Sequence, residues 1–172
     1  MIRMVSESGG GEDFVAELLG QTEARGEMAV FDAIQHLRTK TIERLTGQRS
    51  GRTYFVPGEQ NATYTASLPG QAPASATGKL RQNINAEGPT NDGREISGRV
   101  GVDLRVVPYA RRLEYGGVHF QRRDQVVRFP DGFRLIRAGT VIRTAPRPYL
   151  RPTFDQERAA VESMMQRRLD QG

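Results

Sequence analysis

The chain has 172 residues, of which 37% are hydrophobic, so it can bury one core but hardly two, and we expect a single domain with loose appendages. It has no cysteine and only two histidines, which excludes disulfides, thiolate metal sites and cysteine nucleophiles and argues against a histidine-based zinc site. No apolar run approaches the roughly 20 residues of a membrane helix. The first residues lack the apolar core of a secretory signal, so we expect no membrane partner and synthesis in the cytosol.

Residues 1–21 begin with a glycine- and serine-rich stretch and are predicted to form a mobile arm, or a short helix that contains Phe14 and Leu18. A single domain over residues 22–172 is then expected to open with a long amphipathic helix from about Thr22 to Thr46. Residues of one face recur there at spacings of three and four. They are Val30, Ile34, Leu37, Thr41 and Leu45. His36 lies beside this face and is expected to be a packed histidine rather than a ligand.

Residues 47–78 are rich in Gly, Pro, Ser, Thr and Ala and show no helical period, so we predict an extended loop or arm. Tyr54 and Tyr64 give it apolar anchors and short strand-like stretches. Such a segment either orders against a neighbouring subunit or forms a flexible surface loop.

The sequence Thr77-Gly78-Lys79-Leu80 is not a phosphate-binding loop, because that pattern needs Gly at position 73 and Ser or Thr at position 80, which are Pro and Leu here. We predict instead that Thr77 caps a short helix, with Leu80 and Ile84 packed inward.

Alternating residues and turn signals predict an antiparallel hairpin over residues 84–103, and Pro108 opens a short helix that ends at Gly116-Gly117. Strands are predicted over residues 118–127, 133–136 and 140–143, and a terminal helix follows the prolines near residue 150. The predicted fold class is α+β: a small antiparallel β-sheet packed against a long N-terminal helix and a C-terminal helix, with long extended loops.

The positive charge is concentrated in one segment, because residues 99–151 contain twelve arginines against four carboxylates. Arginines in this number suit contact with a polyanion, since neutralising phosphates releases counterions. They can equally pair with carboxylates of neighbouring subunits or lie on a solvated sheet face.

The order of motifs along the chain carries a resemblance. After the long helix come Pro69-Gly70 with Pro73, then Thr77-Gly78-Lys79-Leu80, then YARRLEYG at residues 109–116 and RPYLRP at residues 147–152. This ordered set resembles the small neck proteins of lambda-type long-tailed phages, known as tail-completion, head-tail joining or minor tail proteins. The resemblance covers about Thr22 to Leu169, with a longer excursion than usual between the last two motifs, over residues 118–145. Gly117 also stands where Thr is common.

The resemblance implies a structural virion protein, made in the host bacterial cytoplasm and located in the neck, at the head-proximal end of the tail. It implies a homo-oligomeric ring, a hexamer, that docks the tail tube or tail-terminator protein to the head connector or stopper protein around the DNA channel. It implies no enzyme activity and no cofactor, and the residues themselves offer no catalytic or metal-ligating set.

Residues of the arm and of the last two motifs are the candidate subunit interface. They are Tyr54, Tyr64, Leu113, Glu114, Tyr115, Gly116, Gly117, Pro148, Tyr149 and Leu150. Alternatively, the apolar members are core residues that join the last helix to the sheet. If the basic segment lines the ring, Arg122, Arg123 and Arg128 are the expected contacts to DNA phosphates.

Two other functions stay open at this point. A tail-terminator ring subunit differs only in its docking partner. A free-standing basic nucleic-acid-binding protein belongs to a different class, and the sequence pI of about 10.1 favours it.

Overall fold

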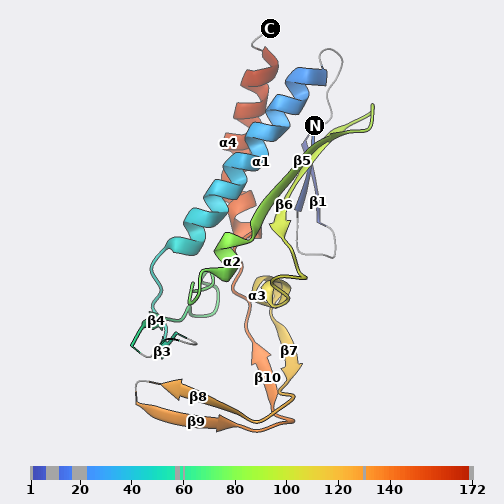
Figure 1. Ribbon diagram of the computed structural model, residues 1–172. Coiled ribbons are helices and arrows are strands. Elements are labelled where there is room, and N and C mark those ends of the chain that lie inside the picture. Colours follow the sequence, from blue (N-terminus) through green and yellow to red (C-terminus); the bar gives the residue numbers. More distant parts are fainter. Residues whose placement is uncertain are drawn as a thin grey trace.

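The computed structural model describes residues 2–6, 12–16, 23–56, 59, 61–129 and 131–170. The fold is α+β, as predicted, with a long helix near the start of the chain, another at its end and small antiparallel sheets (Figure 1). The helices are α1 (Glu23–Thr46), α2 (Lys79–Gln82), α3 (Ala110–Tyr115) and α4 (Arg151–Asp170). The strands are β1 (Ile2–Ser6), β2 (Glu12–Ala16), β3 (Thr53–Phe55), β4 (Thr63–Thr65), β5 (Ile84–Asn91), β6 (Ile96–Val102), β7 (Gly117–Phe120), β8 (Gln125–Phe129), β9 (Gly132–Ile136) and β10 (Val141–Thr144). No helix in this part of the chain is both long enough and apolar enough to cross a bilayer.

Helix α1 forms the centre of the core. The five residues of its predicted apolar face are all buried, which confirms that face. Thr41 is the one polar residue among them, and its hydroxyl donates to the carbonyl of Leu37 at 2.8 Å. The buried face therefore carries no unsatisfied hydroxyl.

A four-stranded antiparallel sheet in the order β1-β2-β6-β5 lies against α1. The predicted hairpin over residues 84–103 is confirmed as β5 and β6, whose register shifts between Glu87 and Thr90. Helix α1 packs closest to the sheet at Gly98 of β6. A Cβ atom at Gly98 would lie 2.7 Å from Cγ2 of Ile34 and 2.9 Å from Cγ1 of Val30, so this approach requires glycine.

The described residues of the segment 1–21 do not form the short helix that was the alternative to a mobile arm. Residues 2–6 and 12–16 are strands β1 and β2, which pair with each other, and β2 also pairs with β6. Neither strand alternates strictly between apolar and polar residues, so no period of two indicates a strand there. Backbone pairing with a distant strand decides their conformation. The remainder of 1–21, which includes Leu18, lies outside the described residues.

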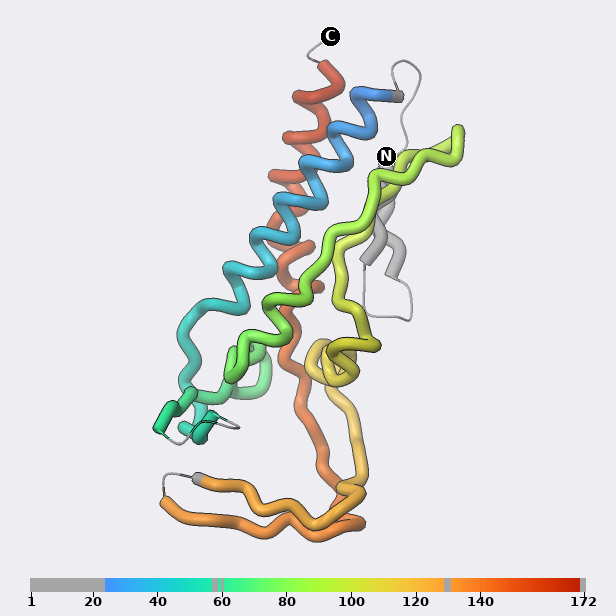
Figure 2. The backbone as a smooth tube through the Cα atoms, in the orientation of Figure 1, coloured from blue at the N-terminus to red at the C-terminus, as the bar shows by residue number. Residues whose placement is uncertain are grey.

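Helix α4 lies beside α1 and runs in the opposite direction (Figures 1 and 2). A hydrogen bond and an ion pair join the helices: Nε2 of His36 lies 2.7 Å from Oε2 of Glu157, and Arg168 donates to Asp32 at 2.7 Å. His36 is thus a packed residue at the edge of the helix interface, as predicted. Phe154, Val161 and Met165 of α4 are buried in the same core as α1.

Two local predictions need correction. Gly78, with φ of +74°, is the N-cap of α2, and the Thr77 hydroxyl lies 3.5 Å from the amide nitrogen of Lys79. Leu80 and Ile84 are buried, as predicted. The strand expected over residues 118–127 is interrupted at residues 121–124, because β7 pairs with β10 whereas β8 pairs with β9.

The molecule is elongated (Figure 2). The two long helices and the β5–β6 hairpin occupy one end, and β7 to β10 extend from α3 at the other end. Within the predicted loop at residues 47–78, β3 and β4 form a short antiparallel ladder near β8. The chain therefore consists of a helix-covered sheet and a separate group of small hairpins.

Candidate assembly interface

The carboxylate of Glu114 joins the two strongest motifs of the sequence. Its Oε2 accepts hydrogen bonds from the backbone N–H groups of Tyr149 at 2.8 Å and Leu150 at 3.1 Å, and its Oε1 accepts one from Arg151 at 2.9 Å. These N–H groups lie at the start of α4, where a helix has no carbonyl partners for its amides and favours a negative charge. Glu114 therefore caps α4 from a helix far away in sequence.

The surrounding backbone reinforces this junction. The amide of Arg147 donates to the carbonyl of Leu113 at 2.7 Å, its Nε donates to the carbonyl of Ser67 at 3.2 Å, and the amide of Gly70 donates to the carbonyl of Pro146 at 2.9 Å. Residues 67–70, 113–116 and 146–151 thus meet in one place, which we call the hub. Three of the motifs that carry the resemblance meet in this hub.

Close packing at the hub explains why residue 116 is a glycine. Gly116 has φ of +74°, and a Cβ atom there would lie 2.9 Å from the carbonyl oxygen of Thr144 and 3.0 Å from Cδ of Pro146. The position requires glycine for both conformation and space.

The predicted interface residues of these motifs differ in burial: three are buried, three are half-buried and two are exposed. Glu114, Tyr149 and Leu150 are buried within the chain, at 5%, 1% and 2% exposure, so the alternative of intramolecular core residues describes them. Burial, with the nearby Glu114 carboxylate, raises the pKa of the Tyr149 hydroxyl well above its usual value. Leu113, Gly116 and Pro148 are half-buried, and Tyr115 and Gly117 are exposed.

Tyr115 remains available to a partner. The guanidinium of Arg151 lies 5.3 Å from the centre of its ring, in a cation–π contact. This contact holds the exposed ring against the start of α4.

Tyr54 and Tyr64 stack on each other across β3 and β4, with ring centres 5.8 Å apart and planes inclined by 25°. Both are half-buried, and burial raises the pKa of Tyr64. The two tyrosines lie in the short strand-like stretches predicted within residues 47–78, which are β3 and β4, and their rings help to line a pocket.

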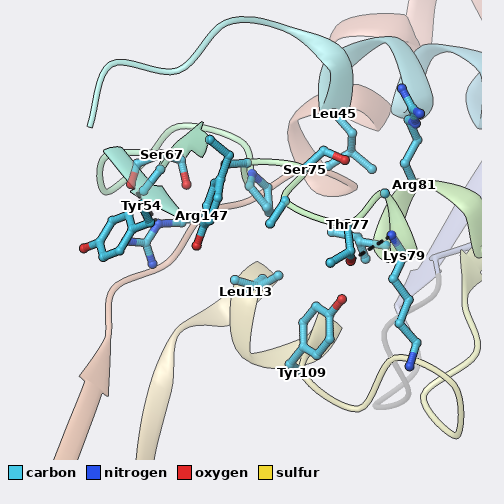
Figure 3. Close-up of a pocket in the computed structure, with 17 residues that line it drawn as sticks. Leu45, Tyr54, Ser67, Ser75, Thr77, Lys79, Arg81, Tyr109, Leu113 and Arg147 are labelled. Atoms are coloured by element: carbon cyan, nitrogen blue, oxygen red, sulfur yellow. Dashed lines mark hydrogen bonds between the residues drawn. The ribbon is translucent and has the colours of Figure 1, made fainter. Parts of the chain in front are cut away.

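This pocket has a volume of about 390 Å³ and lies between the arm, α2 and α3 (Figure 3). Its apolar wall comes from Leu45, Leu80, Tyr109 and Leu113 together with the stacked tyrosines. Its charged lining residues are all cations, which are Lys79, Arg81 and Arg147. The pocket therefore suits an apolar or anionic group and disfavours a positively charged one.

The most exposed apolar surface lies elsewhere, on the excursion between the hub motifs. We call residues 117–144 the double hairpin: the β7–β10 ladder continued by the β8–β9 hairpin. None of its described side chains is buried. Six large apolar side chains are exposed by about half or more: Val118 56%, Phe120 66%, Val126 62%, Phe133 69%, Leu135 55% and Val141 49%.

The strand registers place these side chains on two faces, each of which also carries an arginine: Arg143 opposite Val118 and Arg128 opposite Phe133. Phe120 lies opposite Val141 with Val118 on the same face, and Val126 lies opposite Leu135 with Phe133 on the same face. An isolated two-stranded hairpin is at best marginally stable in water, and exposed apolar patches mark interaction sites. Sequence reasoning missed this surface, although the longer excursion and its alternating pattern were visible signals.

The three arginines expected to contact DNA are all exposed on the double hairpin. Arg122 and Arg123 lie in the connection between β7 and β8. The guanidinium of Arg128 lies 4.3 Å from the centre of the Phe55 ring and 5.9 Å from that of Phe133. Arg122 and Arg123 are thus better placed than Arg128 to meet a phosphate.

The described residues contain no group of three or more His, Cys, Asp or Glu side chains that is placed to hold a metal ion. No family model matches the chain, and neither the curated proteins nor the solved structures contain a match.

Proposed function

We propose that this chain is a structural virion protein of a tailed phage or prophage-like particle. It is a tail-completion or head-tail joining subunit that forms a ring in the neck and docks the tail tube to the head connector around the DNA channel. The observation that carries the proposal is the double hairpin, an exposed apolar projection fixed to a tightly bonded hub.

The double hairpin has no core of its own among its described residues. It has no buried side chain among its described residues, yet it exposes six large apolar ones. Burying such side chains against another protein removes apolar surface from water, at roughly 25 cal/mol per Å². A ring repeats that contact at every subunit and makes many weak contacts act together.

The hub supplies the rigidity that an assembly part needs. Glu114 ties the end of α3 to the start of α4, and Gly116 and Thr144 join the double hairpin to that junction. These contacts connect the base of the projection to the core of the same chain. The resemblance to neck proteins supports the proposal, because it implies a subunit of a ring, a hexamer, at the junction of tail and head.

The first test is cryo-electron microscopy of the purified particle that encodes the chain, with mass spectrometry to identify the protein. The proposal expects ring density between tail tube and connector. Absence of the protein from complete particles would refute it. A pull-down with isolated tubes and with connectors separates this role from that of a tail-terminator ring, which binds the end of the tube.

A free-standing nucleic-acid-binding protein is the second candidate, because Arg122 and Arg123 are exposed. The neck proposal also allows these arginines to touch DNA, through phosphates and without reading sequence. Alanine at Arg122, Arg123 and Arg128 should lower DNA affinity and its salt dependence if the double hairpin faces DNA. The second candidate further requires a monomer or dimer that binds DNA at about 150 mM salt, where electrostatic binding is already weakened.

A further inference from the structure

We propose that the apolar faces of the double hairpin dock onto the N-terminal half of helix α1 in a second copy of this chain. The inference rests on the ring of the proposed function and names the two surfaces that meet. It concerns contact between copies, so it can be tested without any tail or connector.

The double hairpin needs a partner that is not another double hairpin. Six arginines against two aspartates give residues 117–144 a net charge of +4. Two copies packed face to face would bring two such clusters together, and like charges across an interface oppose binding. A symmetric pairing of the projections is therefore disfavoured.

The pocket beside the arm is also a poor partner. Its apolar wall could accept a phenylalanine, but its charged lining residues Lys79, Arg81 and Arg147 are all cations. A projection with a net charge of +4 would meet further positive charge there. The partner surface must combine exposed apolar groups with carboxylates.

Helix α1 offers that combination. Met28 and Phe31, exposed by 58% and 48%, are three residues apart on one helical face. Glu27 and Asp32 are their neighbours in sequence, and the amide of Asn91 donates to Glu27 at 3.3 Å, which places the turn of the β5–β6 hairpin beside this part of the helix.

The charge of this region is opposite to that of the double hairpin. Residues 24–32 and 87–95 together contain five carboxylates against two arginines, a net charge of −3. One of the five, Asp32, is already paired with Arg168 of the same copy. The remaining four are Glu27, Glu87, Asp92 and Glu95, so the helix and the hairpin beside it carry charge opposite to that of the double hairpin.

The two surfaces lie at opposite ends of the elongated molecule (Figure 1). A contact between different surfaces of identical chains is head-to-tail, so each copy can bind two others. Such contacts generate a ring when the rotation closes and a filament when it does not. The geometry thus provides the interface that a ring requires.

Cross-linking between introduced cysteines tests the contact directly, because the chain has no cysteine of its own. We would prepare Phe31→Cys, Phe120→Cys and the double variant, and treat them with a short bismaleimide. The head-to-tail contact predicts a covalent dimer when Phe31→Cys is mixed with Phe120→Cys, and little from either alone. The double variant should give a ladder of higher species. Ser163→Cys, on the exposed side of α4, is the matched control and should not cross-link to Phe120→Cys.

A second test measures self-association of the chain by sedimentation, without a cross-linker. Phe31→Ser and Phe120→Ser change exposed side chains, so each should fold normally, and each should weaken self-association about tenfold or more by sedimentation. Efficient cross-linking between two Phe120→Cys chains, no cross-link between Phe31→Cys and Phe120→Cys, or a chain that stays monomeric would overturn the inference. A confirmed head-to-tail contact in a protein absent from virions would refute only the neck assignment.

Discussion

Glu114 shows how one side chain can organise a junction. Its two oxygens accept three backbone hydrogen bonds at the start of α4, and its side chain is almost completely buried. Hydrogen bonds to a charged group contribute more than neutral ones, and buried amides left without partners are costly. The Glu114 carboxylate therefore stabilises the fold in two ways: its hydrogen bonds are charged, and it gives three backbone amides a partner.

Replacing Glu114 should destabilise the fold, and the loss should be smaller for glutamine than for alanine. Glu114→Gln keeps the shape but removes the charge and one acceptor, so we expect the free energy of unfolding to fall by about 1–2 kcal/mol. Glu114→Ala leaves all three amides unpaired, so a loss of about 3 kcal/mol or more is expected. Urea unfolding followed by circular dichroism measures both. Glu162→Gln on the exposed face of α4 is the control, and an equal loss in that variant would contradict the capping role.

Tyr149 gives the fold a dependence on alkaline pH. Burial raises the pKa of its hydroxyl, so the folded chain keeps the proton after the unfolded chain has released it. Its contribution is fully present below the unfolded pKa of about 10 and is lost as the pH rises toward the folded pKa. The slope contributed by this single group is about 1.4 kcal/mol per pH unit.

Tyr149→Phe should remove that part of the slope. The free energy of unfolding, measured by urea titration from pH 9 to about pH 11, should fall less steeply in the variant than in the natural chain. Burial also raises the pKa values of Tyr64 and Tyr109, so some alkaline dependence should remain. Tyr115→Phe changes an exposed ring and serves as the control. Identical slopes in Tyr149→Phe and the natural chain would show that the hydroxyl is not held neutral.

At the scale of elements, the contact between α1 and β6 depends on the missing side chain of Gly98. A methyl group there would meet Ile34 and Val30 at distances below 3.0 Å. Both neighbours are buried β-branched side chains with little freedom to move. The helix would have to shift away from the sheet.

Gly98→Ala should therefore lower the free energy of unfolding by about 1–3 kcal/mol through overpacking. Combining it with Ile34→Ala provides the control. The double variant should lose less than the sum of the two single losses, because the space opened at position 34 accepts the new methyl group. Calorimetry on the four proteins measures this coupling, and strictly additive losses would contradict the steric explanation.

The elements that were predicted from the sequence are those with a periodicity or turn signals of their own. The buried stripe of α1, the β5–β6 hairpin, the short helix α3 and the terminal helix were all predicted, because each has its own periodicity or turn signals. Strands β1 and β2 were not predicted, since their partners lie in β6 or in each other. The cap by Glu114 was missed for the same reason, because its partners lie 35 to 37 residues away.

The exposed faces of the double hairpin illustrate a further limit. Alternation of apolar and polar residues predicts a strand with one apolar face, but it does not say what covers that face. In β5 and β6 the cover is α1. In β7 to β10 the apolar faces are exposed among the described residues, and only the three-dimensional arrangement distinguishes the two cases.

At the scale of the whole molecule, one part of the chain forms the stable core and another part carries the proposed contacts between copies. The core consists of α1, α4, β5, β6 and the hub, and no described residue of the double hairpin belongs to it. The contacts between hairpin β8–β9 and the remainder of the chain include the ion pair of the exposed Arg52 with Asp131 and the stacking of the exposed Arg128 on the half-buried Phe55. Exposed contacts of this kind contribute about 0–1 kcal/mol each.

Removing residues 122–138 should leave the fold intact and abolish self-association. The amide of Gly139 donates to the carbonyl of Gln121 at 2.8 Å, and the amide of Gln121 donates to Thr140 at 2.9 Å, so the two cut ends already lie side by side. We expect the free energy of unfolding to fall by no more than about 2 kcal/mol, because the two named contacts contribute about 0–1 kcal/mol each. The deleted segment carries Val126, Phe133 and Leu135, so sedimentation should show monomers where the full chain associates. A deletion variant that unfolds would place β8–β9 in the core, and one that still associates like the full chain would show that the hairpin is not needed for contact between copies.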